Sequence, residues 1–294
     1  MRALSPALVL TFGIMLGSAM DATIKYLTIA SPVLIVVLGR YAFGSLFSAL
    51  AYWRAGAPKI TADMWRGHAW RGLFIAAAAS TFFYALSVLP FAEAVALSFI
   101  YPLIIPFVAA LLLGERVRVT SLIAALIGFA GVAVAAQGAP SPADSPQHSL
   151  GVISVLCSAA LLAVAMVLLR QRAQADGALI VSLLSSLIPG LIIAAPAIAL
   201  SGQRQWVDWR ARLLMRLMAA AFMYVLARAY ASAEAQQLAP IHYTELLWAA
   251  ILGYVIFSEQ PRAEIFLGAA LIVAACLYAA YDERRLSRTA RERS

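Results

Sequence analysis

The feature that most constrains this chain is a succession of apolar runs, each about as long as a lipid bilayer is thick. These stretches of roughly 20 mainly apolar residues are bounded by charged residues, Pro or Gly, and a helix of that length spans the hydrocarbon core. The connections are mostly short, so we expect no soluble domain between the runs. We therefore predict an all-α integral membrane protein with ten transmembrane helices, near residues 7–29, 32–53, 70–89, 93–113, 119–137, 150–170, 178–200, 212–232, 238–257 and 264–281.

Composition argues against an ordinary soluble domain. Hydrophobic residues fill 63% of the 294 positions and charged residues 12%, whereas a soluble domain has about half and about a quarter. The net charge of +8 does not indicate nucleic acid, because the basic residues lie between apolar runs or in the C-terminal tail. An N-terminal signal peptide is the alternative for the first run, but that run has the length of a span and similar runs follow it.

Lys and Arg are distributed unequally between the two ends of the predicted spans. With the N-terminus inside, 14 of these side chains fall toward the inner side and 6 toward the outer side, with Arg40 and Arg228 set aside as intramembrane. An excess of Lys and Arg marks the cytoplasmic side. We therefore predict a multi-pass protein of the bacterial inner membrane, with both termini in the cytoplasm.

The second half of the chain repeats the first. AVALSFIYPLIIPFVAALLLGERVRVTSLIAALIGFAGVAVAA, from Ala94, aligns without a gap with LAPIHYTELLWAAILGYVIFSEQPRAEIFLGAALIVAACLYAA, from Leu238, and Glu115 falls on Glu259 (259 − 115 = 144). Five spans per copy is an odd number, so the copies enter the membrane in opposite directions, as in many secondary transporters. The predicted units are a first repeat (1–137), an extracytoplasmic linker (138–149), a second repeat (150–281) and a basic tail (282–294).

The stretch from Tyr84 to residue 136, with its run ending in Gly-Glu-Arg and its Gly-rich closing helix, resembles the EamA module of the drug/metabolite transporter superfamily. The second copy departs from that pattern, with SEQP at 258–261 where the first has GERV at 114–117. The resemblance implies ten helices in two inverted five-helix repeats, and transport of small metabolites without ATP. DATIKYL and GRYAFGSL, in the first two spans, are similar to a subgroup that includes S-adenosylmethionine uptake carriers and some riboflavin carriers.

Charged residues inside the first two spans are candidates for an outer gate. Gly13, Gly17, Asp21 and Lys25 recur every four residues, so they share one helix stripe, and the two glycines allow close helix packing. Asp21 therefore faces protein, and Arg40 on the next span lies at a similar depth, so we predict an ion pair between them. Lys25 is expected to extend outward to the interface.

A second group of candidates follows in the other half. Glu93, just past Pro90, is predicted to join the outer charges, whereas Arg228 flanks an inner turn. His242, Glu245 and Trp248 then lie on one helix face at a spacing of three. We hypothesise that the two groups stabilise alternately closed gates; structural ion pairs, and a packing histidine beside a hydrated carboxylate, are the alternatives.

Aromatic and hydroxyl side chains complete the candidate site. Tyr84 shares a stripe with two serines, Tyr101 faces Ser98, and Tyr224 precedes Arg228 by four residues. Such faces suit an amphipathic or cationic ligand, while packing or interfacial anchoring is the alternative for each tyrosine. Two cysteines in apolar runs and a single His-x-x-Glu pair predict no metal site, and we expect no cofactor.

These features predict a secondary transporter that works by alternating access. The expected partners are the lipid bilayer and a small amino-acid-like, zwitterionic or cationic metabolite such as S-adenosylmethionine. A coupling proton or a counter-substrate is the candidate co-transported species, and the protein is expected to be a monomer or a dimer without nucleic acid. A channel-type facilitator is the alternative; an intramembrane enzyme is less supported, because hydrolase, zincin and ATP-binding motifs are missing from the sequence.

Overall fold

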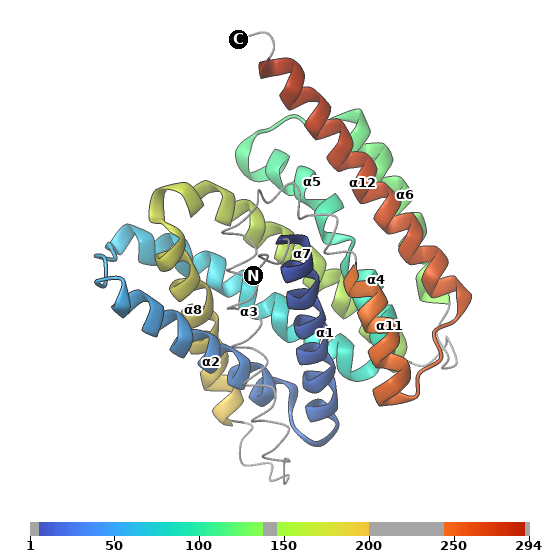
Figure 1. Ribbon diagram of the computed structural model, residues 1–294, viewed down its shortest axis with the longest axis horizontal. Coiled ribbons are helices and arrows are strands. Elements are labelled where there is room, and N and C mark those ends of the chain that lie inside the picture. Colours follow the sequence, from blue (N-terminus) through green and yellow to red (C-terminus); the bar gives the residue numbers. More distant parts are fainter. Residues whose placement is uncertain (1–5, 138–145, 200–243, 292–294) are drawn as a thin grey trace, which may run out of the picture.

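The computed structural model describes residues 6–137, 146–199 and 244–291, and within these ranges every regular element is a helix (Figure 1). The helices are α1 (Pro6–Ala30), α2 (Val33–Arg54), α3 (Ala62–Val88), α4 (Phe91–Ser98), α5 (Tyr101–Leu113), α6 (Val119–Gln137), α7 (Pro146–Asp176), α8 (Ala178–Ala199), α11 (Thr244–Phe257) and α12 (Ala263–Arg291). The predicted span at 212–232 lies outside the described residues.

Helix α3 begins well before the predicted start of the third span. Thr61 is its N-cap, and the Thr61 hydroxyl accepts a hydrogen bond from the Met64 N–H at 3.3 Å. Asp63 in the first turn complements the positive end of the helix dipole. The polar stretch that the sequence placed in a connection is therefore the first two turns of the helix, and it carries His68 to the end of the bundle.

The predicted span at 93–113 is divided into two helices, α4 and α5. The backbone N–H groups of Phe99 and Ile100 bond three residues back, to Ala96 and Leu97 at 3.3 Å, which tightens the chain between the helices. Pro102 has no N–H to offer to the Ser98 carbonyl, so the regular α-helical ladder stops there. The break separates Ser98, the last residue of α4, from Tyr101, the first of α5.

The helices pack in matched pairs. Helix α6 lies along α12 and α2 along α8, while α1 packs on α11 and α5 packs on α7 (Figure 1). Adding 144 to the residue numbers turns α1, α2, α5 and α6 into α7, α8, α11 and α12. The α6–α12 and α2–α8 contacts then stay the same, whereas the α1–α11 contact becomes the α5–α7 contact. A twofold relation between the halves produces this pattern of contacts.

Five stretches of the described residues are long and apolar enough to cross a membrane: Val33–Arg54, Ala62–Val88, Phe91–Leu113, Pro146–Arg172 and Leu179–Ala199. Large apolar side chains such as Leu111 and Leu126 are exposed on the helix surfaces, 84% and 65% respectively. Exposed apolar surface of this extent is stable against lipid chains and not against water. The protein is therefore a multi-pass membrane protein.

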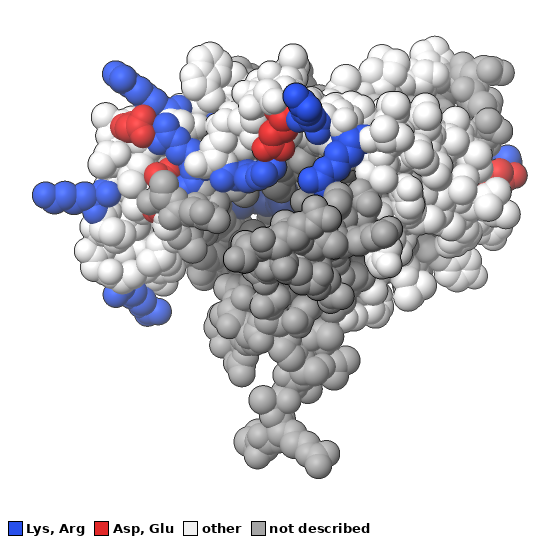
Figure 2. All heavy atoms as spheres, turned by 90° about the horizontal axis from the view of Figure 1, so that it is seen from above, with Lys and Arg blue, Asp and Glu red and all other residues white. Residues whose placement is uncertain are grey.

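The two ends of the bundle differ in charge. We call the end that carries the α1–α2 and α11–α12 connections the outer end, and the end that carries the α2–α3, α5–α6 and α7–α8 connections the inner end (Figure 1). Lys and Arg side chains gather over the half of the molecule where α2–α3 and α7–α8 connect (Figure 2). The inner end carries Arg54, Lys59, Arg66, Arg116, Arg118, Arg170 and Arg172.

Candidate functional site

A cluster of charged residues lies where helices of the two halves meet. Asp21 comes from α1, Arg40 from α2, and Glu245 from the first turn of α11, and all three side chains are partly buried. Asp21 interacts electrostatically with Arg40, and Glu245 interacts with both of them. Two acidic side chains therefore lie near one guanidinium group.

Several polar atoms around this cluster have no hydrogen-bond partner among the described residues. They are Oδ1 of Asp21, Oγ of Ser18 and Nε1 of Trp248, and each is shielded from solvent. Ser18 lies one turn before Asp21 on α1, and Trp248 one turn after Glu245 on α11. A buried polar atom without a partner is costly, and such atoms mark places where a water, an ion or a ligand binds.

The direct ion pair that the sequence predicted between Asp21 and Arg40 does not form among the described residues. The Arg40 guanidinium lies instead over the ring of Phe83, with its Cζ 5.2 Å from the centroid, and 5.8 Å from the centroid of Tyr41. A guanidinium stacks well on aromatic faces, so these rings hold Arg40 at the level of Asp21. The sequence did not predict these aromatic contacts, and the one to Phe83 depends on how α3 packs.

Lys25 does not extend to the membrane surface as predicted. Its Nζ lies 2.9 Å from Oε1 of Glu259, and it also donates a hydrogen bond to the Leu89 carbonyl. The other carboxylate oxygen of Glu259 accepts the Phe91 N–H at 2.6 Å. Leu89 ends α3 and Phe91 begins α4, so the pair ties α1 and the α11–α12 connection to backbone groups that the helix ends leave free.

Glu93 joins the outer charges, as predicted. Its Oε1 lies 2.9 Å from Nε2 of His148, and both side chains are buried. Glu93 also interacts electrostatically with Lys25 and Glu259. This outer cluster of Lys25, Glu93, His148 and Glu259 therefore links α1, α4, α7 and the α11–α12 connection.

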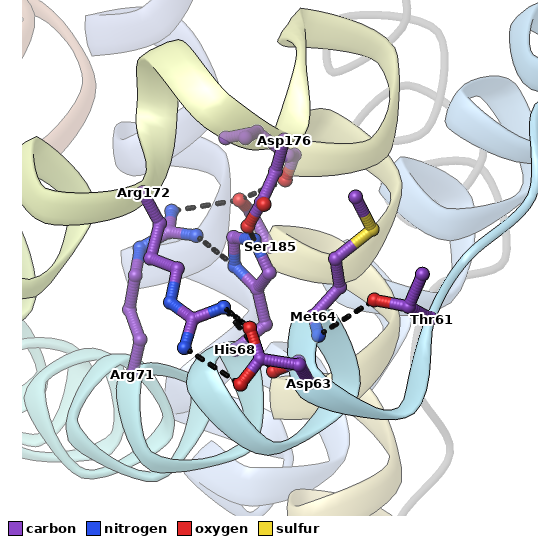
Figure 3. A network of polar contacts seen from close by, with 9 residues as sticks. Thr61, Asp63, Met64, His68, Arg71, Arg172, Asp176 and Ser185 are labelled. Carbon is purple, nitrogen blue, oxygen red and sulfur yellow. Dashed lines mark hydrogen bonds and ion pairs between the residues drawn. The ribbon is translucent and has the colours of Figure 1, made fainter.

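A second buried network lies at the inner end, and the sequence did not predict it (Figure 3). Nε2 of His68 lies 3.0 Å from Oδ2 of Asp176, and Arg71 donates to Nδ1 of His68 at 3.1 Å and to the Ser185 hydroxyl at 2.7 Å. A neutral imidazole satisfies both contacts, with a proton on Nε2 and a free lone pair on Nδ1. The three-residue spacing of His68 and Arg71 on one helix face was the available signal.

Two further ion pairs lie at the inner end. Arg172 contacts the Asp63 carboxylate with both terminal nitrogens, and the second contact, from Nη2 to Oδ1, measures 3.1 Å. Arg170 lies 3.3 Å from Oε1 of Glu115. Every ion pair among the described residues therefore joins side chains that the sequence placed on the same side of the membrane.

The remaining predicted site residues either lie near hydrogen bonds within a single helix, are partly buried, or lie outside the described residues. Ser98 donates to the Val95 carbonyl at 2.7 Å, and the Tyr84 carbonyl accepts from Ser87 at 2.7 Å, so both serine hydroxyls are used within their own helices. Tyr84 and Tyr101 are partly buried. Tyr224, Arg228 and His242 lie outside the described residues. Among the described residues, no three His, Cys, Asp or Glu side chains are grouped for a metal ion.

Fold and site together define a class: a helical membrane protein that carries charged groups between its halves, as carriers of small solutes do. The chain belongs to the EamA-like transporter family, whose pattern it matches twice, over residues 4–137 and 149–281. The resemblance expected from the sequence is confirmed, including its subgroup.

Transporters of different solutes are similar along nearly the whole chain. The S-adenosylmethionine uptake transporter of Rickettsia bellii is 26% identical, over 92% of this chain and 91% of that protein. The riboflavin transporter of Rhizobium johnstonii is 29% identical, over 92% and 89%, and the pseudopaline exporter of Pseudomonas aeruginosa 25% identical, over 88% and 90%. A solved crystal structure aligns with a TM-score of 0.61 over 96% of this chain and 98% of its own at 21% identity, which shows a shared fold.

Proposed function

We propose that this protein is a secondary transporter of the bacterial inner membrane that moves a small cationic or zwitterionic metabolite by alternating access. The proposal includes ten transmembrane helices in two inverted repeats, with both termini in the cytoplasm. The exchange of helix contacts, α1 with α11 and α5 with α7, supports the inverted relation. The basic inner end supports the orientation.

The observation that carries the proposed substrate class is the cluster of Asp21, Arg40 and Glu245. Its two acidic side chains lie near only one guanidinium group, so a ligand that brings a positive charge would stabilise their ionised forms. The Asp21 oxygen that has no partner among the described residues could bind an ammonium or sulfonium group, and Arg40 a carboxylate. S-adenosylmethionine carries all three groups, and relatives that transport it support this choice.

Ligand binding tests the proposal directly. Purified protein in detergent is heated with S-adenosylmethionine, single amino acids or riboflavin, and a bound ligand raises the melting temperature. We expect S-adenosylmethionine to raise it, and Asp21→Asn to weaken binding by about 10-fold or more, because a charge-assisted hydrogen bond is lost. Glu264→Gln, an exposed carboxylate on α12, is the matched control.

Transport separates a carrier from a channel. In proteoliposomes, labelled substrate should enter faster when unlabelled substrate is preloaded, because a carrier returns loaded faster than empty. Uptake without such acceleration contradicts the carrier mechanism. Equal binding by Asp21→Asn and the parent protein contradicts the assignment of the site.

A further inference from the structure

We propose that the ion pairs Lys25–Glu259 and Arg170–Glu115 are equivalent gate contacts, which the inverted repeats place at opposite ends of the molecule. This inference rests on the proposed function. Glu115 and Glu259 are repeat equivalents at an offset of 144, and Lys25 and Arg170 differ by 145 (170 − 25 = 145). The second copy thus repeats the glutamate at the same offset, and its basic residue lies one position after Leu169, the equivalent of Lys25.

The surrounding elements are equivalent too. Lys25 lies near the end of α1, and Arg170 lies near the end of α7, the repeat equivalent of α1. Glu259 follows α11, and Glu115 follows α5, the equivalent of α11. Each pair therefore joins the first helix of one repeat to the connection after the fourth span of the other repeat. Such a pair closes the gap between the repeats at one end.

The two pairs differ in a way that indicates which end is closed here. Lys25 and Glu259 are 2.9 Å apart, with side chains only 11% and 15% exposed. Arg170 and Glu115 are 3.3 Å apart, with side chains 65% and 44% exposed. A buried pair with a short contact holds its helices firmly, whereas an exposed pair contributes little. Of these two pairs, the outer one is therefore the firmly closed contact in this structure.

Additional contacts at the outer end strengthen the closed arrangement. Lys25 donates to the Leu89 carbonyl, its Nζ lies 5.2 Å from the centre of the Phe257 ring, and Glu259 accepts the Phe91 N–H. Outward opening must break the contacts to Phe257 and Glu259, because these cross between the two repeats. We expect the inner pair to become the buried one in that state, so that each pair favours the opposite conformation.

A cysteine reporter at the outer end tests this inference, because breaking the two ion pairs should change its labelling rate in opposite directions. Ala92 on α4 is buried against α11 and α12, so Ala92→Cys reports on separation at the outer end. Cys157→Ser and Cys276→Ala remove the native thiols. Reaction with a membrane-impermeant maleimide, added outside proteoliposomes of known orientation, then measures how often the outer end opens.

We expect Glu259→Gln to raise the labelling rate about 10-fold, and Glu115→Gln to lower it several-fold, because each removes the pair that favours one state. Glu264→Gln should leave it unchanged. Lys25→Arg keeps a positive charge and hydrogen-bond donors beside Glu259 and the Leu89 carbonyl, so it should keep the labelling rate slow.

Shifts of the same sign in Glu259→Gln and Glu115→Gln would overturn the inference, as would an unchanged rate in Glu259→Gln. The labelling needs no substrate, so its outcome is independent of the binding test above. Opposite shifts together with failed S-adenosylmethionine binding would leave the gate contact in place and remove only the substrate assignment.

Discussion

Asp21 and Lys25 lie one turn apart on α1, yet their charged groups differ in the contacts that they make. Lys25 meets a carboxylate and a backbone carbonyl, so its charge is compensated. Asp21 has an oxygen with no hydrogen-bond partner among the described residues, and it lies near a second acidic side chain, Glu245. A structural ion pair is satisfied within the protein, whereas a binding residue keeps bonding capacity for its ligand. By this distinction we expect Asp21, and not Lys25, to bind the ligand.

Arg71 is expected to be a strong stabilising residue. Arg71→Ala should lower the free energy of unfolding by about 3 kcal/mol, because it leaves His68 and Ser185 buried without their donor. Unfolding in mixed detergent micelles measures the loss. Arg66→Ala, an exposed arginine on the same helix, should cost less than about 0.5 kcal/mol. Equal losses in the two variants would show that the inner network does not stabilise the protein.

At the scale of helices, small residues decide which elements come closest. Gly131 on α6 faces Gly268 on α12, and a Cβ on Gly131 would lie 2.8 Å from the Gly268 carbonyl oxygen. Apolar burial gives little drive to helix association in lipid, so close backbone packing is what holds this pair together. The Gly-rich character of these spans was visible in the sequence, but the partner of each glycine was not.

Gly131→Val should therefore separate α6 from α12. We expect a loss of about 1–3 kcal/mol in the free energy of unfolding, since overpacking at a tight contact forces the backbones apart. The neighbouring Ala130→Val places the same side chain on the exposed face of α6 and should change little. Unfolding curves that coincide for the two variants would contradict a tight α6–α12 contact.

For the whole molecule, the proposed inverted relation between the repeats predicts the sidedness of two equivalent connections. Arg116, next to Glu115, and Gln260, next to Glu259, are both exposed. In cells, Gln260→Cys should react with an impermeant maleimide added outside, whereas Arg116→Cys should react only after the membrane is permeabilised. Labelling of both from the same side would contradict the inverted repeats and, with them, alternating access. Labelling of Arg116→Cys alone from outside would reverse the proposed orientation.

The sequence by itself determined the class of fold and the repeat, because the length of the spans, the charge asymmetry and the 144-residue offset can be read directly from it. It also identified Asp21, Arg40 and Glu245, since a charge within an apolar run is conspicuous wherever it packs. Only the tertiary structure decided the partners: Lys25 with Glu259, His68 with Asp176, and Arg40 over Phe83. Each of these contacts joins residues on different elements of the fold, and helical periodicity specifies the direction of a side chain but not which element it meets.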